Sequence, residues 1–277
     1  MNEGLSYSFH LGSDKNKKAN LRNKAKENAS GTTSLSNNAI QNIKQLGKVN
    51  HHNLRKYDNQ LELINTIKGT NDIINDVKDL YLELFEEAKL EYNNKQKRDD
   101  RKIKNYFDKI SNDTKHDLAC EIIIELGDMK YWENKSQKDK LKMVDVFKEQ
   151  IIDLEKVVPN FKVANATIHF DESSPHLHII GVPYKDICKT GLSRQVGKSD
   201  VFTKESLTII QDKMRVYCIN SFNKVYNLKE ELKEKQQGRN RDINVKDMGN
   251  YQRMKKQLNQ DKDKLDKANK KSLELDN

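Results

Sequence analysis

A single stretch of sixteen residues, 166–181, constrains the fold of this chain more than any other part of the sequence. It reads Ala-Thr-Ile-His-Phe-Asp-Glu-Ser-Ser-Pro-His-Leu-His-Ile-Ile-Gly, and on both sides of its acidic centre the residues alternate between two faces, as in strands. The alternation begins upstream and places Val163, Asn165 and Thr167 on one face. Residues 171–175 have the composition of a turn, and their proline suits the mouth of a hairpin. The stretch therefore predicts two antiparallel strands joined by a tight turn.

Three of the seven histidines share one face of this predicted hairpin. His169 closes the first strand, and His176 and His178 lie two residues apart on the second. Facing Cβ atoms of antiparallel strands are about 5 Å apart and diagonal ones about 7–8 Å, so three imidazoles can converge on one divalent ion. A lone strand histidine is more often an ordinary hydrogen-bonded residue, but three in phase around an acidic turn favour a metal site. We predict that these three residues bind one metal ion.

The spacing argues against the best-known alternative, a zincin protease. That motif, His-Glu-x-x-His, needs two histidines four residues apart on a helix. Here Glu172 follows His169 by three residues, and the two-residue spacing of the later pair fits a strand.

Residues 169–178, His-x-Asp-Glu-x-x-Pro-His-x-His, resemble the metal motif of the MobV (Pre/Mob) plasmid mobilisation relaxases. These enzymes belong to the HUH endonucleases, which are named after a His-hydrophobic-His pair like that at 176–178. The resemblance covers roughly residues 1–228. It implies an HUH fold, a divalent cofactor (Mn²⁺ or Mg²⁺) and the cutting of one strand of plasmid DNA.

A second polar stretch contains the candidate nucleophiles. Adjacent histidines in a polar loop are usually surface residues, but His52 begins the tetrapeptide His-Asn-Leu-Arg, which is similar to the His-Asn-x-Arg motif of MobV relaxases. The resemblance implies that His52 is the nucleophile and that Asn53 and Arg55 contact DNA phosphate. Most other HUH enzymes use tyrosine, which makes Tyr57 the alternative nucleophile. A second family motif, Asn-Tyr-Glu-Leu, has only a partial counterpart at residues 59–63.

Four acidic residues could support such a site. Glu172 could orient a metal ligand or the nucleophile, because metal-bound histidines usually have a second polar partner. Asp171 is a weaker candidate for the same role. Glu121 and Glu125 share one face of a predicted strand, 118–126. A carboxylate near the metal is conceivable there, although the exposed face of the sheet is the default interpretation.

The charge distribution predicts an anionic partner. The chain carries a net charge of +9, and residues 1–56 contain ten Lys/Arg against three Asp/Glu. Residues 12–30 are either a solvated, disordered arm or an arm that becomes ordered on phosphates. The basic run 95–104 either contacts a phosphate backbone or ends a solvated helix. The arm residues predicted to bind DNA are Lys15, Lys17, Lys18 and Arg22.

The order of elements predicts an α+β fold, in which a central antiparallel sheet has helices packed on one face and the histidines on the other. We expect strands at 5–11, 118–126, 163–170 and 176–180. We expect helices at 34–46 (ended by Gly47), 72–95, 138–157 and 203–226.

Two segments are predicted: an HUH relaxase-like, DNA-nicking domain over residues 1–228, and a polar linker with a helical tail over 229–277. The tail shows a short coiled-coil pattern from residue 251, through which a homodimer could form. The chain stops within this pattern, which indicates a truncated chain or a short helical tail.

Cysteine usage and hydropathy bear on location. Three widely spaced cysteines without a Cys-x-x-Cys pair indicate reduced thiols in the cytosol. No apolar run reaches the roughly 20 residues of a membrane span, so we expect a cytoplasmic protein. Residues 197–199, Gly-Lys-Ser, resemble the end of a Walker A loop, but position 192 lacks the required glycine, which argues against nucleotide binding.

The sequence therefore predicts a metal-dependent relaxase that nicks and rejoins plasmid DNA at an origin of transfer. The expected substrate is single-stranded DNA or an extruded hairpin, and the expected intermediate is a covalent 5′-phosphoryl enzyme. Two alternatives stay open: a rolling-circle replication initiator, and a non-catalytic DNA-binding protein with a structural metal.

Overall fold

The computed structural model describes residues 4–12, 39–56, 63–234 and 253. Contacts divide the chain into two units, residues 1–233 and 234–277, and the candidate site lies entirely in the first. The predicted boundary after residue 228 stays a prediction, and the predicted coiled coil lies almost wholly outside the described residues. In the described part of the chain, no helix is both long enough and apolar enough to cross a membrane.

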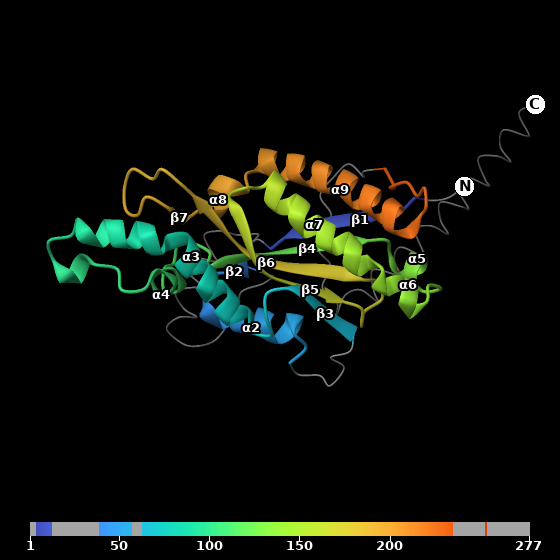
Figure 1. Cartoon of the computed structure of the whole chain (residues 1–277), viewed down its shortest axis with the longest axis horizontal. Coiled ribbons are helices and arrows are strands. Elements are labelled where there is room, and N and C mark those ends of the chain that lie inside the picture. The colour runs from blue at the N-terminus through green and yellow to red at the C-terminus, as the bar shows by residue number, and fades with distance from the viewer. Residues whose placement is uncertain (1–3, 13–38, 57–62, 235–252, 254–277) are drawn as a thin grey trace, which may run out of the picture. The chain divides into compact units, whose positions relative to one another are not determined.

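A sheet of seven strands forms the centre of the first unit (Figure 1). Its main order is β1-β4-β6-β5-β3; the short strands β2 and β7 pair with β4 and β6, and all these pairs are antiparallel. The predicted antiparallel sheet is thus confirmed. The strands are β1 (Tyr7–Leu11), β2 (Ala39–Ile40), β3 (Ile64–Lys68), β4 (Ala119–Leu126), β5 (Phe161–His169), β6 (His176–Lys185) and β7 (Gln195–Val196).

The helices begin where the sequence offers capping side chains. Asp72 accepts hydrogen bonds from backbone N–H groups of the first turn of α3, and Thr203 does the same for α9. The predicted helix 138–157 is divided in two at Lys142. The helices are α2 (Ile43–Asn53), α3 (Ile73–Asn94), α4 (Tyr106–Ser111), α5 (Met129–Trp132), α6 (Gln137–Leu141), α7 (Met143–Val157), α8 (Lys198–Val201) and α9 (Lys204–Tyr226).

Helices α7 and α9 cover one face of the sheet, as predicted (Figure 1). Phe147 of α7 and Phe222 of α9 are completely buried against it, and each contributes on the order of 2 kcal/mol of burial free energy. A second apolar cluster lies on the opposite face, where Phe85 of α3 packs with Ile180 and Tyr184 of β6. Helices α2, α3 and α4 therefore cover part of the face that carries the histidines, and this second layer was not predicted.

The predicted end of a helix at Gly47 is wrong. Helix α2 begins at Ile43 after the N-cap Asn42, and it continues through Gly47 to Asn53. An interior glycine costs a helix about 1 kcal/mol, and the burial of Leu46 and Leu54 offsets this cost. The histidine pair predicted in a loop consequently occupies the last turn of a helix.

A β-bulge in β5 corrects the predicted faces of two residues, Val163 and Ala164. The register of β5 on β6 shifts between Val163 and Asn165. As a result Val163 belongs to the apolar cluster under α7 and α9, while Ala164 packs into the cluster on the opposite face. Asn165, beyond the bulge, keeps the phase that leads to His169.

The lysine of the Gly-Lys-Ser tripeptide has a structural role. Nζ of Lys198 lies 2.7 Å from Oδ2 of Asp117 and 2.7 Å from the carbonyl oxygen of Gly12. These contacts support the sequence argument against nucleotide binding. All three cysteines are free: Cys120 and Cys218 are buried, and Cys188 is partly exposed.

Candidate metal and nucleophile site

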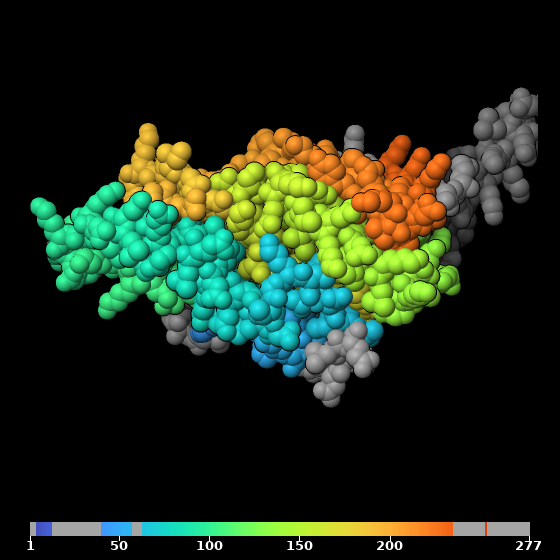
Figure 2. Space-filling view, in the orientation of Figure 1, coloured from blue at the N-terminus to red at the C-terminus, as the bar shows by residue number. Residues whose placement is uncertain are grey.

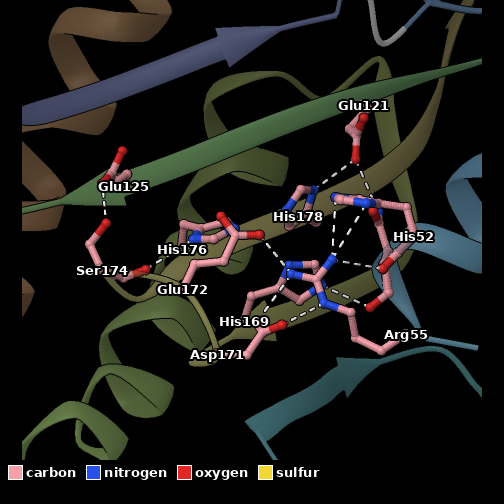
Figure 3. A network of polar contacts seen from close by, with 11 residues as sticks. His52, Arg55, Glu121, Glu125, His169, Asp171, Glu172, Ser174, His176 and His178 are labelled. Carbon is pink, nitrogen blue, oxygen red and sulfur yellow. Dashed lines mark hydrogen bonds and ion pairs between the residues drawn. The ribbon is translucent and has the colours of Figure 1, made fainter. Parts of the chain in front are cut away.

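The register of the hairpin brings the three predicted histidines together. His169 on β5 pairs directly with His176 on β6, and His178 points to the same face two residues further on. The centroid of the His169 ring lies 5.2 Å from that of His176 and 4.3 Å from that of His178. The ring centroids of His176 and His178 are 5.0 Å apart. Because β6 is held between β4 and β5, the cluster stands on paired strands rather than on a loop (Figure 3).

Each of these histidines has one ring nitrogen engaged by a fixed oxygen atom. An oxygen acceptor requires N–H at that nitrogen, so the other nitrogen keeps its lone pair. Nδ1 of His169 and Nε2 of His178 are buried and have no hydrogen-bond partner among the described residues. Such atoms are rare in proteins, and ligands for a metal ion explain them. The engaging pairs are His169 Nε2 with the Asn53 carbonyl (2.8 Å), His176 Nδ1 with the Ser174 carbonyl (3.0 Å) and His178 Nδ1 with Glu121 Oε1 (2.8 Å).

His52 joins this cluster from the end of α2. Its ring centroid lies 5.8 Å from that of His169 and 5.6 Å from that of His178, and its side chain remains accessible to solvent. Partial burial of the ring, followed by the positive charge of Arg55, lowers the pKa of His52 below its ordinary value. The imidazole is therefore neutral near pH 7.

Two overlapping sets of ligand atoms could hold a cation. In one set, nitrogens of His52, His169 and His178 lie within 4.8 Å of one another. In the other set, a carboxylate oxygen of Glu172 and nitrogens of His169 and His176 also lie within 4.8 Å of one another. His169 belongs to both sets, which places it at the centre of the cluster.

Arg55 is buried and its guanidinium is engaged by carboxylates. Only 4% of the residue is exposed, and its guanidinium forms a two-bond ion pair with Asp171 (2.7 and 3.1 Å) and a further one with Glu172 (2.7 Å). Its Nη1 also donates to the carbonyl oxygen of His52 at 3.1 Å. In the absence of DNA, Arg55 joins the end of α2 to the turn of the hairpin (Figure 3), and its predicted DNA contact stays a prediction.

Asn53 is buried in the same way. It is only 1% exposed in the absence of DNA, and its predicted DNA contact stays a prediction. Its side-chain amide donates to Oε1 of Glu121 at 3.0 Å, while its carbonyl oxygen accepts from His169. Asn53 thus contacts His169 directly and reaches His178 through Glu121.

Glu121 is the site residue that the sequence analysis undervalued. Its carboxylate is buried, accepts hydrogen bonds from Asn53 and His178, and has a pKa raised by burial. The signal was an acid among apolar residues in a central strand, on the same face as the histidines. Glu125, two positions along that face, instead accepts a hydrogen bond from Ser174.

The two acids of the hairpin turn are ionised. Burial alone would raise the pKa of Asp171, but the hydrogen bond and charge of Arg55 outweigh burial and lower it. Burial likewise opposes ionisation of Glu172, but His176 and then Arg55 bring its pKa below the ordinary value. Oε2 of Glu172 lies 3.8 Å from Nε2 of His176, beside the metal cluster.

Several predicted residues lie outside the described part of the chain. They comprise the alternative nucleophile and the basic residues of the N-terminal arm, and their roles stay predictions. These residues are Tyr57, Lys15, Lys17, Lys18 and Arg22.

Comparison with known proteins identifies a family. The family Mob_Pre, described as plasmid recombination enzyme, matches residues 37–228. A search of curated protein sequences finds no match. One similar solved structure is the Mn-bound MobM relaxase domain (MOBV; Mob_Pre) bound to plasmid pMV158 oriT DNA at pH 4.6. The two chains are 19% identical, the match covers 76% of this chain and 94% of that chain, and the TM-score is 0.49. Another is the same domain bound to 26nt pMV158 oriT DNA, with 16% identity, 88% and 99% covered, and a TM-score of 0.49.

The family match includes every residue of the cluster described above, from His52 to His178. It confirms the resemblance that the motifs at residues 52–55 and 169–178 predicted. The chain belongs to the Mob_Pre family of plasmid recombination enzymes.

Proposed function

We propose that this chain is a relaxase, which cuts one strand of plasmid DNA and becomes covalently joined to the 5′-phosphate. The observation that carries the proposal is the position of His52, accessible to solvent yet less than 6 Å, ring to ring, from His169 and His178. DNA approaching from solvent would meet a neutral nucleophile beside a cluster suited to a cation. Family membership supports the proposal, because recombination of plasmid DNA requires that DNA strands be broken.

The chemistry of the donor atoms fits a divalent ion. We assign the ligands to the nitrogens not engaged by oxygen, namely Nδ1 of His169, Nε2 of His176 and Nε2 of His178. When bound, the ion would act as a Lewis acid on the scissile phosphate. Three imidazoles suit Mn²⁺ better than Mg²⁺, because Mg²⁺ prefers oxygen ligands. Three protein ligands also leave coordination positions for phosphate oxygens.

His52 would attack phosphorus with a ring nitrogen that carries a lone pair. As the nitrogen–phosphorus bond forms, the bond from phosphorus to the 3′ oxygen breaks. The proton lost from the other ring nitrogen balances the proton that the 3′ oxygen takes up on leaving as a hydroxyl. The covalent adduct conserves the energy of the broken phosphodiester bond, so that a later attack by a 3′-hydroxyl can rejoin the strand.

Arg55 and its two acids would position the nucleophile rather than the DNA. Asp171 holds the guanidinium through two hydrogen bonds, and that guanidinium in turn holds the carbonyl of His52. Glu172 accepts a further hydrogen bond from the same guanidinium and lies beside the ring of His176. Hydrogen bonds from His52 through the guanidinium to Glu172, followed by the 3.8 Å contact of Glu172 with His176, therefore connect the proposed nucleophile with a proposed metal ligand.

A non-catalytic metal site is the second candidate function. It is favoured by one observation: nitrogens of His52, His169 and His178 lie within 4.8 Å of one another, so His52 could itself be a ligand. Such a protein would bind a metal and DNA but would not cut. A rolling-circle initiator would share the cutting chemistry and differ in the origin that it recognises.

The proposed partner is plasmid DNA at an origin of transfer, as single strand or extruded hairpin. The basic residues 15–22 are proposed to bind its phosphates, so affinity should depend steeply on salt. The cytoplasmic location and the homodimer through the C-terminal helix remain proposals from the sequence.

A nicking assay tests the proposed function. Supercoiled plasmid that carries the protein's own origin should convert to open circles only with a divalent ion, and the protein should stay attached to the DNA. The variant His176→Ala should not cut, whereas His116→Ala, an exposed histidine outside the cluster, should cut like the wild type. Wild-type cutting by His176→Ala would contradict the proposal, and metal binding without any cutting would favour the second candidate.

A further inference from the structure

A basic loop, residues 95–104, follows the end of α3. It contains six Lys/Arg and two Asp, a net charge of +4, whereas the rest of the chain beyond residue 56 has a net charge of −2. Both aspartates pair within the loop, Asp99 with Lys102 and Asp100 with Arg98. Four exposed cations have no ion pair among the described residues: Lys95, Lys97, Arg101 and Lys104. The loop is therefore a local concentration of uncompensated positive charge.

The loop is closed by specific hydrogen bonds at its base. The side chain of Asn93 donates to the carbonyl oxygen of Ile103 (2.9 Å) and accepts from its backbone N–H (2.8 Å). Ile103 is buried in the apolar cluster beneath α3, so this end of the loop is anchored in the core. The backbone that carries the cations is thus anchored before a ligand arrives, which lowers the entropic cost of binding.

Helix α3 sets the distance between this loop and the nucleophile. It begins beside the last turn of α2, where the backbone N–H of Ile73 donates to Oδ1 of Asn50, two residues before His52. Its 22 residues span roughly 33 Å, at 1.5 Å per residue. Figure 2 shows α3 running from the region of α2 to one end of the described part of the first unit. The basic loop accordingly lies on the order of 30 Å from the candidate site.

We propose that the basic loop binds the phosphates of a duplex arm of the DNA substrate, about ten base pairs from the cut. A duplex advances about 3.4 Å per base pair, so roughly ten pairs span the length of α3. A DNA duplex is rigid over such lengths, so it can span the fixed distance between the candidate site and the basic loop. A flexible single strand has no fixed length that would suit this distance. The inference rests on the proposed function, because His52 must mark the position of the cut.

The test compares binding of two oligonucleotides with the same single-stranded tail and duplex arms of about four or about fourteen base pairs, below and above the span of α3. In Lys97→Gln/Arg101→Gln, affinity for the long arm should fall on the order of tenfold. The slope of log affinity against log salt should become shallower by about two. Affinity for the short arm should stay at the wild-type value.

The matched control is Lys130→Gln/Lys138→Gln, which removes two exposed lysines from the opposite end of the sheet, at α5 and α6 (Figure 1). It should bind both oligonucleotides like the wild type. Unchanged binding of the long arm by the loop variant, or an equal loss on both arms or in the control, would overturn the inference. Cutting of the short-arm oligonucleotide is scored separately: its absence in the wild type would contradict the proposed function, not the binding role of the loop.

Discussion

The side-chain amide of Asn53 donates to Glu121 over 3.0 Å, and this hydrogen bond joins the helix of the candidate nucleophile to the strand behind the metal cluster. The same carboxylate accepts from His178, and the carbonyl of Asn53 accepts from His169. Two proposed ligands are therefore oriented by one connected pair of residues. The positions of the nucleophile and of the ligands are coupled through this contact.

Glu121→Ala should weaken metal binding by about 10- to 100-fold, the usual effect of removing an outer partner of a metal histidine. The ring of His178 would lose the acceptor that fixes its tautomer. Calorimetric titration with Mn²⁺ measures the affinity directly, and His116→Ala, outside the cluster, is the control. Equal Mn²⁺ affinity in the wild type and Glu121→Ala would show that the carboxylate does not position the site.

Arg55→Lys should destabilise the fold by about 2 kcal/mol, because a lysine cannot form the two-bond ion pair with Asp171 and also reach Glu172. For a domain of this size the melting temperature should fall by roughly 4–8 °C. Calorimetry of the metal-free protein measures the change. The exposed neighbour Lys56→Ala provides the control, and a melting temperature of Arg55→Lys within 1 °C or so of the wild type would contradict the structural role.

The metal-free protein should lose stability as the pH falls below about 6.5, well above the pH range in which carboxylates titrate. Burial, followed by the neighbouring His178, lowers the pKa of His169 to about 3. Between an unfolded pKa near 6.5 and this value, the unfolded chain binds more protons, so stability is full above about pH 6.5 and declines as the pH falls. Urea unfolding at several pH values between about 7.5 and 5 measures the slope. The slope should be shallower in His169→Gln, and a flat profile for the wild type would contradict the buried neutral histidine.

The hairpin was predictable from the sequence because strand alternation is a local signal. The pairing of His169 with His176 follows from the two-residue period on each side of a turn that contains Pro175, and the register confirms it. The bulge at Ala164 was not predictable, since Val163 and Ala164 are both apolar and either could face the core.

The contacts that organise the site could not be read from local patterns. Asn53 and Glu121 are 68 residues apart, and Arg55 and Asp171 are 116 residues apart. Each pair forms only because α2 ends over the sheet, and that position depends on the passage of the helix through Gly47. Residues that a motif suggested as DNA contacts are consequently buried and hold the site together.

We propose that His52 forms the covalent bond to DNA, and the chemistry of the trapped adduct measures this most directly. A phosphorus–nitrogen bond to histidine is labile in acid, whereas a phosphotyrosine ester survives brief acid treatment. We predict that the adduct formed on plasmid DNA is lost in acid, that peptide mapping places it on His52, and that His52→Ala forms none. An acid-stable adduct, or one that persists in His52→Ala and disappears in Tyr57→Phe, would contradict the claim and assign the reaction to Tyr57.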